Sequence, residues 1–181
     1  MRKCVLLLLL VTAACAPWVR VGGGYQHAEK NFSVDLPDGW MRFNNVQYLL
    51  VTRDGILLQT ISIDRMKVTD SLKHTKKKLA LDMLPQEAAE VIADNMNSDT
   101  NISDFILLEN SPTTIAGRAG FKLVYTYKNK DGLLFKSVYC GFISEDLFYD
   151  LRYTAPARYY FDKDLGTFEK VLNSFAFIKA A

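Results

Sequence analysis

The stretch FKLVYTYKNKDGLLFKSVYCGFISEDLFYDLRYT, from Phe121 to Thr154, decides the fold. It contains three runs rich in aromatic and β-branched residues, which are typical of strands. Asn129-Lys130-Asp131-Gly132 and Ser144-Glu145-Asp146 separate the runs, and turns this short can join only antiparallel neighbours. The stretch therefore predicts three antiparallel strands, over 121–127, 133–143 and 147–154.

Sequence before this stretch extends the sheet. Asn31 to Leu36 alternates apolar and polar residues, which predicts a strand that ends in a turn at Pro37-Asp38-Gly39. Two further strand-like runs, 47–52 and 56–66, flank Arg53-Asp54-Gly55 and predict a hairpin.

Helical spacing of apolar residues occurs in two regions. Residues 70–97 carry it, and Pro85 interrupts it, so we expect helices at about 71–83 and 85–97. A third helix is expected near the C-terminus, capped by Asp162 or Asp164, with a short strand over 174–178 after it. Its predicted apolar stripe comprises Leu165, Phe168, Leu172 and Phe175. The order predicts the α+β class, with a largely antiparallel sheet and helices packed on it.

The N-terminus has the pattern of a secretory signal peptide. Two basic residues precede an apolar core over 4–11, and Thr12-Ala13-Ala14-Cys15 follows. The uncharged stretch over 4–19 would reach only about 24 Å as a helix, short of a hydrocarbon core of about 30 Å. Small residues followed by Cys15 resemble the lipobox of bacterial lipoproteins, in which the signal is cut before the cysteine and its thiol receives lipid. The alternative is a plainly secreted protein.

These patterns divide the chain into three parts. Residues 1–14 are expected to be a lipoprotein signal peptide. Residues 15–30 are expected to be the lipidated Cys15 and a flexible tether, because they contain Pro17 and Gly22-Gly23-Gly24 and little periodicity. Residues 31–181 are expected to form the folded domain. Since Ala16 follows Cys15, we expect an exported, membrane-anchored protein of the cell envelope, held at the outer membrane and facing the periplasm in a diderm cell.

Processing changes the charge and the cysteine count. The full chain of 181 residues has 22 basic and 20 acidic residues, and loss of Arg2 and Lys3 would leave 20 of each. This balance argues against partners held by net charge, nucleic acid included. Only Cys140 would remain with a free thiol, so no disulfide within the domain is expected. Its place in an apolar strand predicts a buried, inert thiol.

The layout resembles the PsbP-like group, which includes extrinsic proteins of photosystem II, a yeast Ran-binding import factor and bacterial lipoproteins of the DcrB type. The likeness spans about residues 31–178. It rests on the opening strand and its Pro-x-Gly-Trp turn over 32–40, on Ile115-Ala116-Gly117-Arg118, on the hairpin over 125–139 and on the closing helix that runs into Ser174-Phe175. The resemblance implies an αβα sandwich used for binding and assembly, with no metal role carried over to this chain.

No catalytic motif stands out. His27 and His74 have no metal-ligand spacing around them, so neither a metal site nor another cofactor is expected, and no serine triad is indicated. Aromatic residues are dense over 121–161, and along 149–153 Tyr149, Leu151 and Tyr153 alternate with Asp150 and Arg152. Since tyrosine is favoured at interfaces, we place a candidate interaction surface near the end of this region. It comprises Arg152, Tyr153, Arg158, Tyr159 and Tyr160.

The residues and motifs are compatible with three functions. The favoured one is a non-catalytic, lipid-anchored envelope protein that binds or assembles with another envelope component. The alternative is a carrier of a small apolar or lipidic ligand, which needs an aromatic-lined cleft between sheet and helices. An enzyme is not expected. It would need two acidic groups that converge in a cleft with perturbed pKa values.

Overall fold

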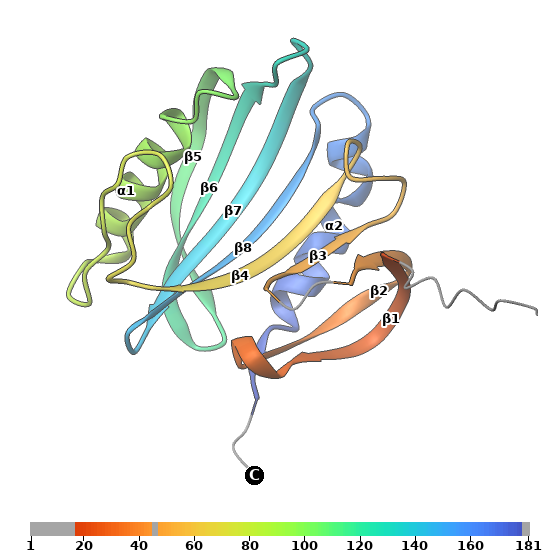
Figure 1. The fold of residues 1–181 in the computed structure, drawn as a ribbon, viewed down its shortest axis with the longest axis horizontal. Helices are drawn as coiled ribbons and strands as arrows, with labels where there is room; N and C mark the ends of the chain where they lie inside the picture. The colour runs from red at the N-terminus through yellow and green to blue at the C-terminus, as the bar shows by residue number, and fades with distance from the viewer. Residues whose placement is uncertain (1–16, 45–46, 179–181) are drawn as a thin grey trace, which may run out of the picture.

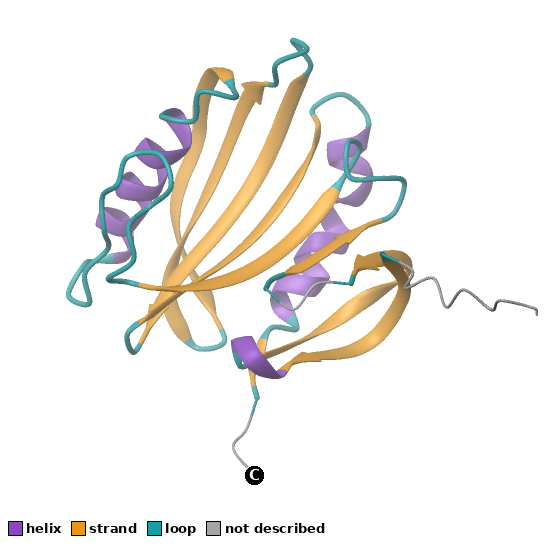
Figure 2. Cartoon of the chain, viewed as in Figure 1, coloured by secondary structure: helices purple, strands orange, loops and turns teal. Residues whose placement is uncertain are grey.

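The computed structural model describes residues 17–44 and 47–178. These residues form a curved sheet and two α-helices (Figures 1 and 2). The elements, in chain order, are β1 (Trp18–His27), the short 3-10 helix η1 (Ala28–Lys30), β2 (Phe32–Phe43), β3 (Leu49–Thr52), β4 (Thr60–Lys67), α1 (Pro85–Asn97), β5 (Ser103–Ile115), β6 (Arg118–Lys128), β7 (Leu134–Ser144), β8 (Leu147–Pro156), α2 (Tyr160–Asn173) and β9 (Ala176–Phe177).

The strands pair in the order β1-β2-β3-β4-β8-β7-β6-β5, and β9 adds to β2. Every pairing between the described strands is antiparallel. The three strands predicted over 121–154 are present as β6, β7 and β8, joined by the two expected turns. The prediction of a largely antiparallel α+β fold is therefore confirmed.

Each face of the sheet carries one helix. On β8, Leu151 and Tyr153 point into the core cluster that contains Phe161 and Phe168 of α2, whereas Phe148 points into the cluster that contains Ala88 and Ile92 of α1. The alternation predicted along 149–153 is confirmed, because Asp150 and Arg152 lie on the α1 side. Cys140 is buried as expected, and burial raises the pKa of its thiol to about 12.

The prediction of a flexible tether over 15–30 is wrong where the structure describes it, because residues 18–27 form β1 and pair with β2. The glycines allow a β-bulge in the pairing of β1 with β2, and they do not form a linker. Val21 pairs with Trp40 and Gly23 with Leu36, so Gly22 alone lies opposite Pro37, Asp38 and Gly39. A Cβ on Gly22 would meet Asp38, and Gly23 has a φ of 74°, which favours glycine. The predicted turn at 37–39 is this bulge inside β2.

The predicted helix over 71–83 is also wrong, because this segment is a loop that wraps over α1. Leu72 and Leu79 are buried in the α1 cluster, and Lys76 adopts a left-handed φ of 60°. The side-chain oxygen of Asn95 in α1 accepts the backbone N–H groups of His74 and Thr75 at 2.9 and 3.2 Å. Burial of two leucines and satisfaction of these donors outweigh the local helical pattern. The second predicted helix, 85–97, is confirmed as α1.

Smaller differences concern element ends. The hairpin around Arg53-Asp54-Gly55 is confirmed, but its loop runs over 53–59, because β4 begins only at Thr60. Helix α2 begins at Tyr160 and has no side-chain cap, so neither Asp162 nor Asp164 caps it. Strand β5 was not predicted. The short final strand is present as β9.

Candidate functional site

A groove of about 500 Å³ opens on the α1 side of the sheet, over β3, β4 and β8. Helix α1 packs on β5, β6 and β7, so it leaves β3, β4 and β8 uncovered on this face of the sheet. The floor comes from the sheet and one wall from α1 and the loop before it. Its lining residues are Tyr48, Leu50, Thr60, Ser62, Asp64, Met66, Ser71, Leu72, Lys73, Ile92, Asn95, Met96, Tyr139, Phe148, Asp150 and Arg152.

Two carboxylates lie side by side on the floor. Asp64 of β4 is the direct antiparallel partner of Asp150 of β8. Lys30 neutralises Asp64 through an ion pair with a Nζ–Oδ1 distance of 2.7 Å. Among residues 17–44 and 47–178, no hydrogen bond or ion pair engages the carboxylate of Asp150. Burial and the neighbouring Asp64 raise the pKa of Asp150 to about 6, against the attraction of Arg152.

Arg152 lies beside Asp150 on the same strand face, next to tyrosine hydroxyls. In β-pairing it faces Ser62 of β4 and Tyr139 of β7. Burial acts to lower the pKa of Arg152, but Tyr125, Asp150 and Tyr139 outweigh it and hold the pKa above its ordinary value. Burial also raises the pKa of Tyr139 and Tyr125, so both hydroxyls stay protonated. The groove therefore offers the basic side chains of Arg152 and Lys73, the titratable carboxyl of Asp150 and the protonated hydroxyl of Tyr139.

The structure does not bring the predicted interaction surface together. Arg152 lies on the groove floor, whereas Tyr153 is buried on the opposite face. Its hydroxyl donates to the carbonyls of Tyr160 and Phe161 at 2.9 and 3.0 Å, which fixes the start of α2. Arg158 and Tyr159 are exposed after β8, and Tyr160 is half-buried. Tyr153 is therefore a core residue and is not part of the predicted interaction surface.

Sequence reasoning missed most of the groove. Asp64, Lys73 and Asn95 carried no local signal, because only the pairing of β4 with β8 and the folded loop place them together. Asp150 did carry one, since it shares a strand face with Arg152 on the side opposite the apolar residues. A buried strand with two charges on one face indicates that this face lines a polar cavity.

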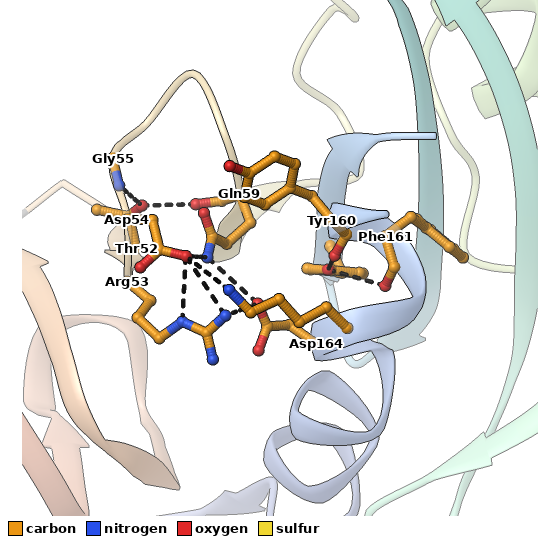
Figure 3. A network of polar contacts seen from close by, with 10 residues as sticks. Thr52, Arg53, Asp54, Gly55, Gln59, Tyr160, Phe161 and Asp164 are labelled. Carbon is orange, nitrogen blue, oxygen red and sulfur yellow. Dashed lines mark hydrogen bonds and ion pairs between the residues drawn. The ribbon is translucent and has the colours of Figure 1, made fainter. Parts of the chain in front are cut away.

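A second polar cluster ties the β3–β4 loop to α2 (Figure 3). The buried carboxylate of Asp164 forms an ion pair with Arg53 at 2.8 Å and accepts a hydrogen bond from the side-chain amide of Gln59 at 3.2 Å. The carboxylate of Asp54 accepts a hydrogen bond from the side-chain amide of Gln59 at 2.9 Å and forms an ion pair with the ammonium of Lys163 at 3.3 Å. The hydrogen bond from Gln59 and the charge of Lys163 lower the pKa of Asp54. Each charged group here is paired within the molecule, so this cluster holds the loop against α2.

Residues 17–44 and 47–178 contain no group of three or more His, Cys, Asp or Glu side chains that could hold a metal ion. The same residues include no helix long and apolar enough to cross a membrane.

Comparison with known proteins identifies the fold. No protein-family model and no curated sequence matches this chain. Among solved structures, cyanobacterial PsbP (CyanoP) from Synechocystis sp. PCC 6803 aligns with a TM-score of 0.59 at 11% identity, over 92% of this chain and 96% of that chain. The domain has the PsbP-like fold.

Two other solved structures share the PsbP-like fold. The Ran-binding protein Mog1p of Saccharomyces cerevisiae aligns with a TM-score of 0.57 at 10% identity, over 89% of this chain and 97% of that chain. LpqN of Mycobacterium tuberculosis, described as involved in cell envelope biogenesis, aligns with a TM-score of 0.56 at 16% identity, over 90% of this chain and 91% of that chain. These identities establish a shared architecture, whereas function has to be argued from the site.

Proposed function

We propose that this chain is an exported, lipid-anchored protein of the cell envelope, and that its PsbP-like domain is a non-catalytic binding module. Lipid at Cys15 would confine the domain to the membrane surface and raise its effective concentration near an envelope partner. The groove over β4 and β8 is the binding site. The fold is compatible with this role, since LpqN is described as involved in cell envelope biogenesis and Mog1p as a Ran-binding protein.

The observation that carries this proposal is the state of Asp150. Asp150 is half-buried, and within residues 17–44 and 47–178 no hydrogen bond or ion pair engages its carboxylate, which is therefore available to a partner. Asp150 faces an open groove beside Arg152. A partner segment with a basic side chain can pair with Asp150, and the apolar lining from Leu50, Met66 and Met96 can accept its neighbours.

A carrier function is the second candidate, because the groove lies between the sheet and α1 and its lining includes Tyr48, Tyr139 and Phe148. This is the aromatic-lined cleft that the carrier hypothesis requires. The charged floor favours an amphipathic ligand with a polar head over a purely apolar one.

The groove also contains the two converging carboxylates that an enzyme would require. Asp64, however, is ion-paired with Lys30, so it is not free to act as a second acid or base. His74, which would be the expected proton carrier, has its Nε2 at 3.6 Å from Asp99 and does not line the groove. The arrangement suits recognition better than acid–base chemistry.

Replacement of the proposed lipid acceptor tests the anchor. In cells that express Cys15→Ser, we expect incorporation of labelled fatty acid to be lost and the protein to leave the membrane fraction. Cys140→Ser is the matched control, because its thiol is buried and should take no lipid. Unchanged labelling of Cys15→Ser would contradict the anchor.

Site-specific photo-crosslinking tests the groove. A benzophenone amino acid replaces Tyr48 in the groove or, as a control, the equally half-buried Tyr25 of β1. We expect a reproducible protein adduct from position 48 only, and its loss on Arg152→Met. Recovery of a bound small molecule in place of a protein would favour the carrier. Equal adducts from both positions would contradict the groove as the site.

A further inference from the structure

The chain between the proposed lipid and the folded sheet is very short. Strand β1 begins at Trp18, three residues after Cys15. Three residues span at most about 11 Å when fully extended. A lipid on Cys15 therefore allows the PsbP-like domain no freedom to stand away from the bilayer, and the edge of the sheet near Trp18 must lie at the headgroups.

The β3–β4 loop begins near this part of the sheet, two strands from β1. Arg20 of β1 pairs with Met41 of β2, and Met41 pairs with Thr52, the last residue of β3. Adjacent strands are about 4.8 Å apart, so only two strand spacings separate the N-terminal part of β1 from the start of the loop over 53–59. Figure 1 shows the chain entering β1 on the same side of the domain as this loop.

The tip of this loop exposes two large aliphatic side chains. Ile56 and Leu57 are 54% and 75% exposed, and Leu57 is the more exposed of the two. Tyr159, 66% exposed, precedes α2, and its ring lies 5.4 Å from the ammonium of Lys163, which also pairs with Asp54 of the loop. Aliphatic, tyrosine and lysine side chains together are typical of membrane–water interfaces.

The loop is held in place rather than left to collapse on the domain. The Thr52 hydroxyl donates to the carbonyl of Gln59 at 2.6 Å and accepts the N–H of Gly55 at 3.1 Å, which closes the loop at its base. The Arg53–Asp164 pair fastens it to α2 (Figure 3). These bonds hold the base of the loop, while Ile56 and Leu57 at its tip stay exposed.

From these observations we propose that the loop over 53–59, with Tyr159 beside it, is a membrane-docking surface. Ile56 and Leu57 insert at the headgroup boundary and fix the orientation of the domain on the bilayer. This proposal rests on the lipid anchor at Cys15 proposed above. Because the groove lies on one face of the sheet, the orientation of the docked domain decides in which direction the groove faces.

A fluorescent probe at the loop tip tests the proposal on the complete lipidated protein. The variants Leu57→Cys and Leu81→Cys are labelled with a nitrobenzoxadiazole maleimide, to which the buried Cys140 is inaccessible. Leu81 is the matched control, since it is a loop leucine that is 62% exposed but lies beside Arg118 and Glu145, at the opposite end of the strands. Both proteins are reconstituted in vesicles of phosphatidylethanolamine and phosphatidylglycerol that carry a nitroxide-labelled lipid.

We expect a blue shift and strong nitroxide quenching for the probe at position 57, with neither for the probe at position 81. Equal, water-like spectra at both positions in a protein that carries labelled fatty acid would overturn the docking surface and leave the anchor intact. Absence of fatty acid on Cys15 would overturn the anchor and the docking surface with it, so the two failures are distinct.

Discussion

Arg53→Met is expected to destabilise the domain by about 3 kcal/mol, because it leaves a buried charge without its counterion. The Asp164 side chain is only 2% exposed, and its pair with Arg53 has an N–O distance of 2.8 Å. After the substitution the carboxylate keeps, within the described part of the chain, the hydrogen bond from Gln59 at 3.2 Å. Urea unfolding followed by circular dichroism would measure the loss as a lower midpoint with an unchanged slope.

A matched control is available in the pair between Lys77 and Asp94, which has the same 2.8 Å distance. Its side chains are 58% and 45% exposed, so Lys77→Met should change the free energy of unfolding by less than about 0.5 kcal/mol. The double variant Arg53→Met with Asp164→Leu should recover most of the stability, since it removes both charges. An equal small effect of Arg53→Met and Lys77→Met would show that burial of Asp164 contributes little.

The sequence predicts the central strands well because their signals are local. The runs that became β6, β7 and β8 alternate strictly and are separated by short turns, so neighbouring residues alone specify the pairing. The helix predicted over 71–83 fails for the opposite reason. Its apolar residues Leu72 and Leu79 do become buried, but against α1 and in a loop, and only the folded Asn95 supplies the bonds that replace helical ones.

The glycine run over 22–24 shows the same limit at the level of one position. Glycines without periodicity are typical of linkers, yet here two of them permit a bulge opposite 37–39. The requirement comes from a partner strand, which a single segment cannot reveal. The groove is harder still, because its two carboxylates come from strands β4 and β8, which are far apart in the chain and pair directly.

Asp150→Asn is expected to stabilise the isolated domain by about 3 kcal/mol near neutral pH, the free-energy equivalent of about two pKa units. Burial raises the pKa of this carboxyl from 3.8 to about 6, so the folded state prefers the neutral form. Below about pH 4 the group is protonated in both folded and unfolded chains, and the variant should gain almost nothing. Between about pH 4 and 6 the unfolded chain ionises Asp150 while the folded chain keeps it protonated, so the advantage of asparagine grows over this range and is constant above it.

Urea unfolding at several pH values between about 4 and 8 measures this dependence. Asp64→Asn is the control, since Asp64 lies directly opposite but is ion-paired with Lys30 and 45% exposed. Removal of that partner should not stabilise the domain at any pH in this range. A pH-independent effect of Asp150→Asn would contradict the raised pKa.

A raised pKa and a carboxylate without a hydrogen bond to residues 17–44 or 47–178 are the features expected of a group that binds a partner. Burial removes water from around the ionised carboxylate of Asp150, and a basic side chain from a partner would stabilise that charge in its place. Binding and ionisation of Asp150 therefore favour each other. Asp150→Asn should therefore increase stability and at the same time reduce the adduct formed from position 48. If the variant gained stability and kept the adduct in full, the partner would be recognised by Arg152 and the apolar lining, without the carboxylate.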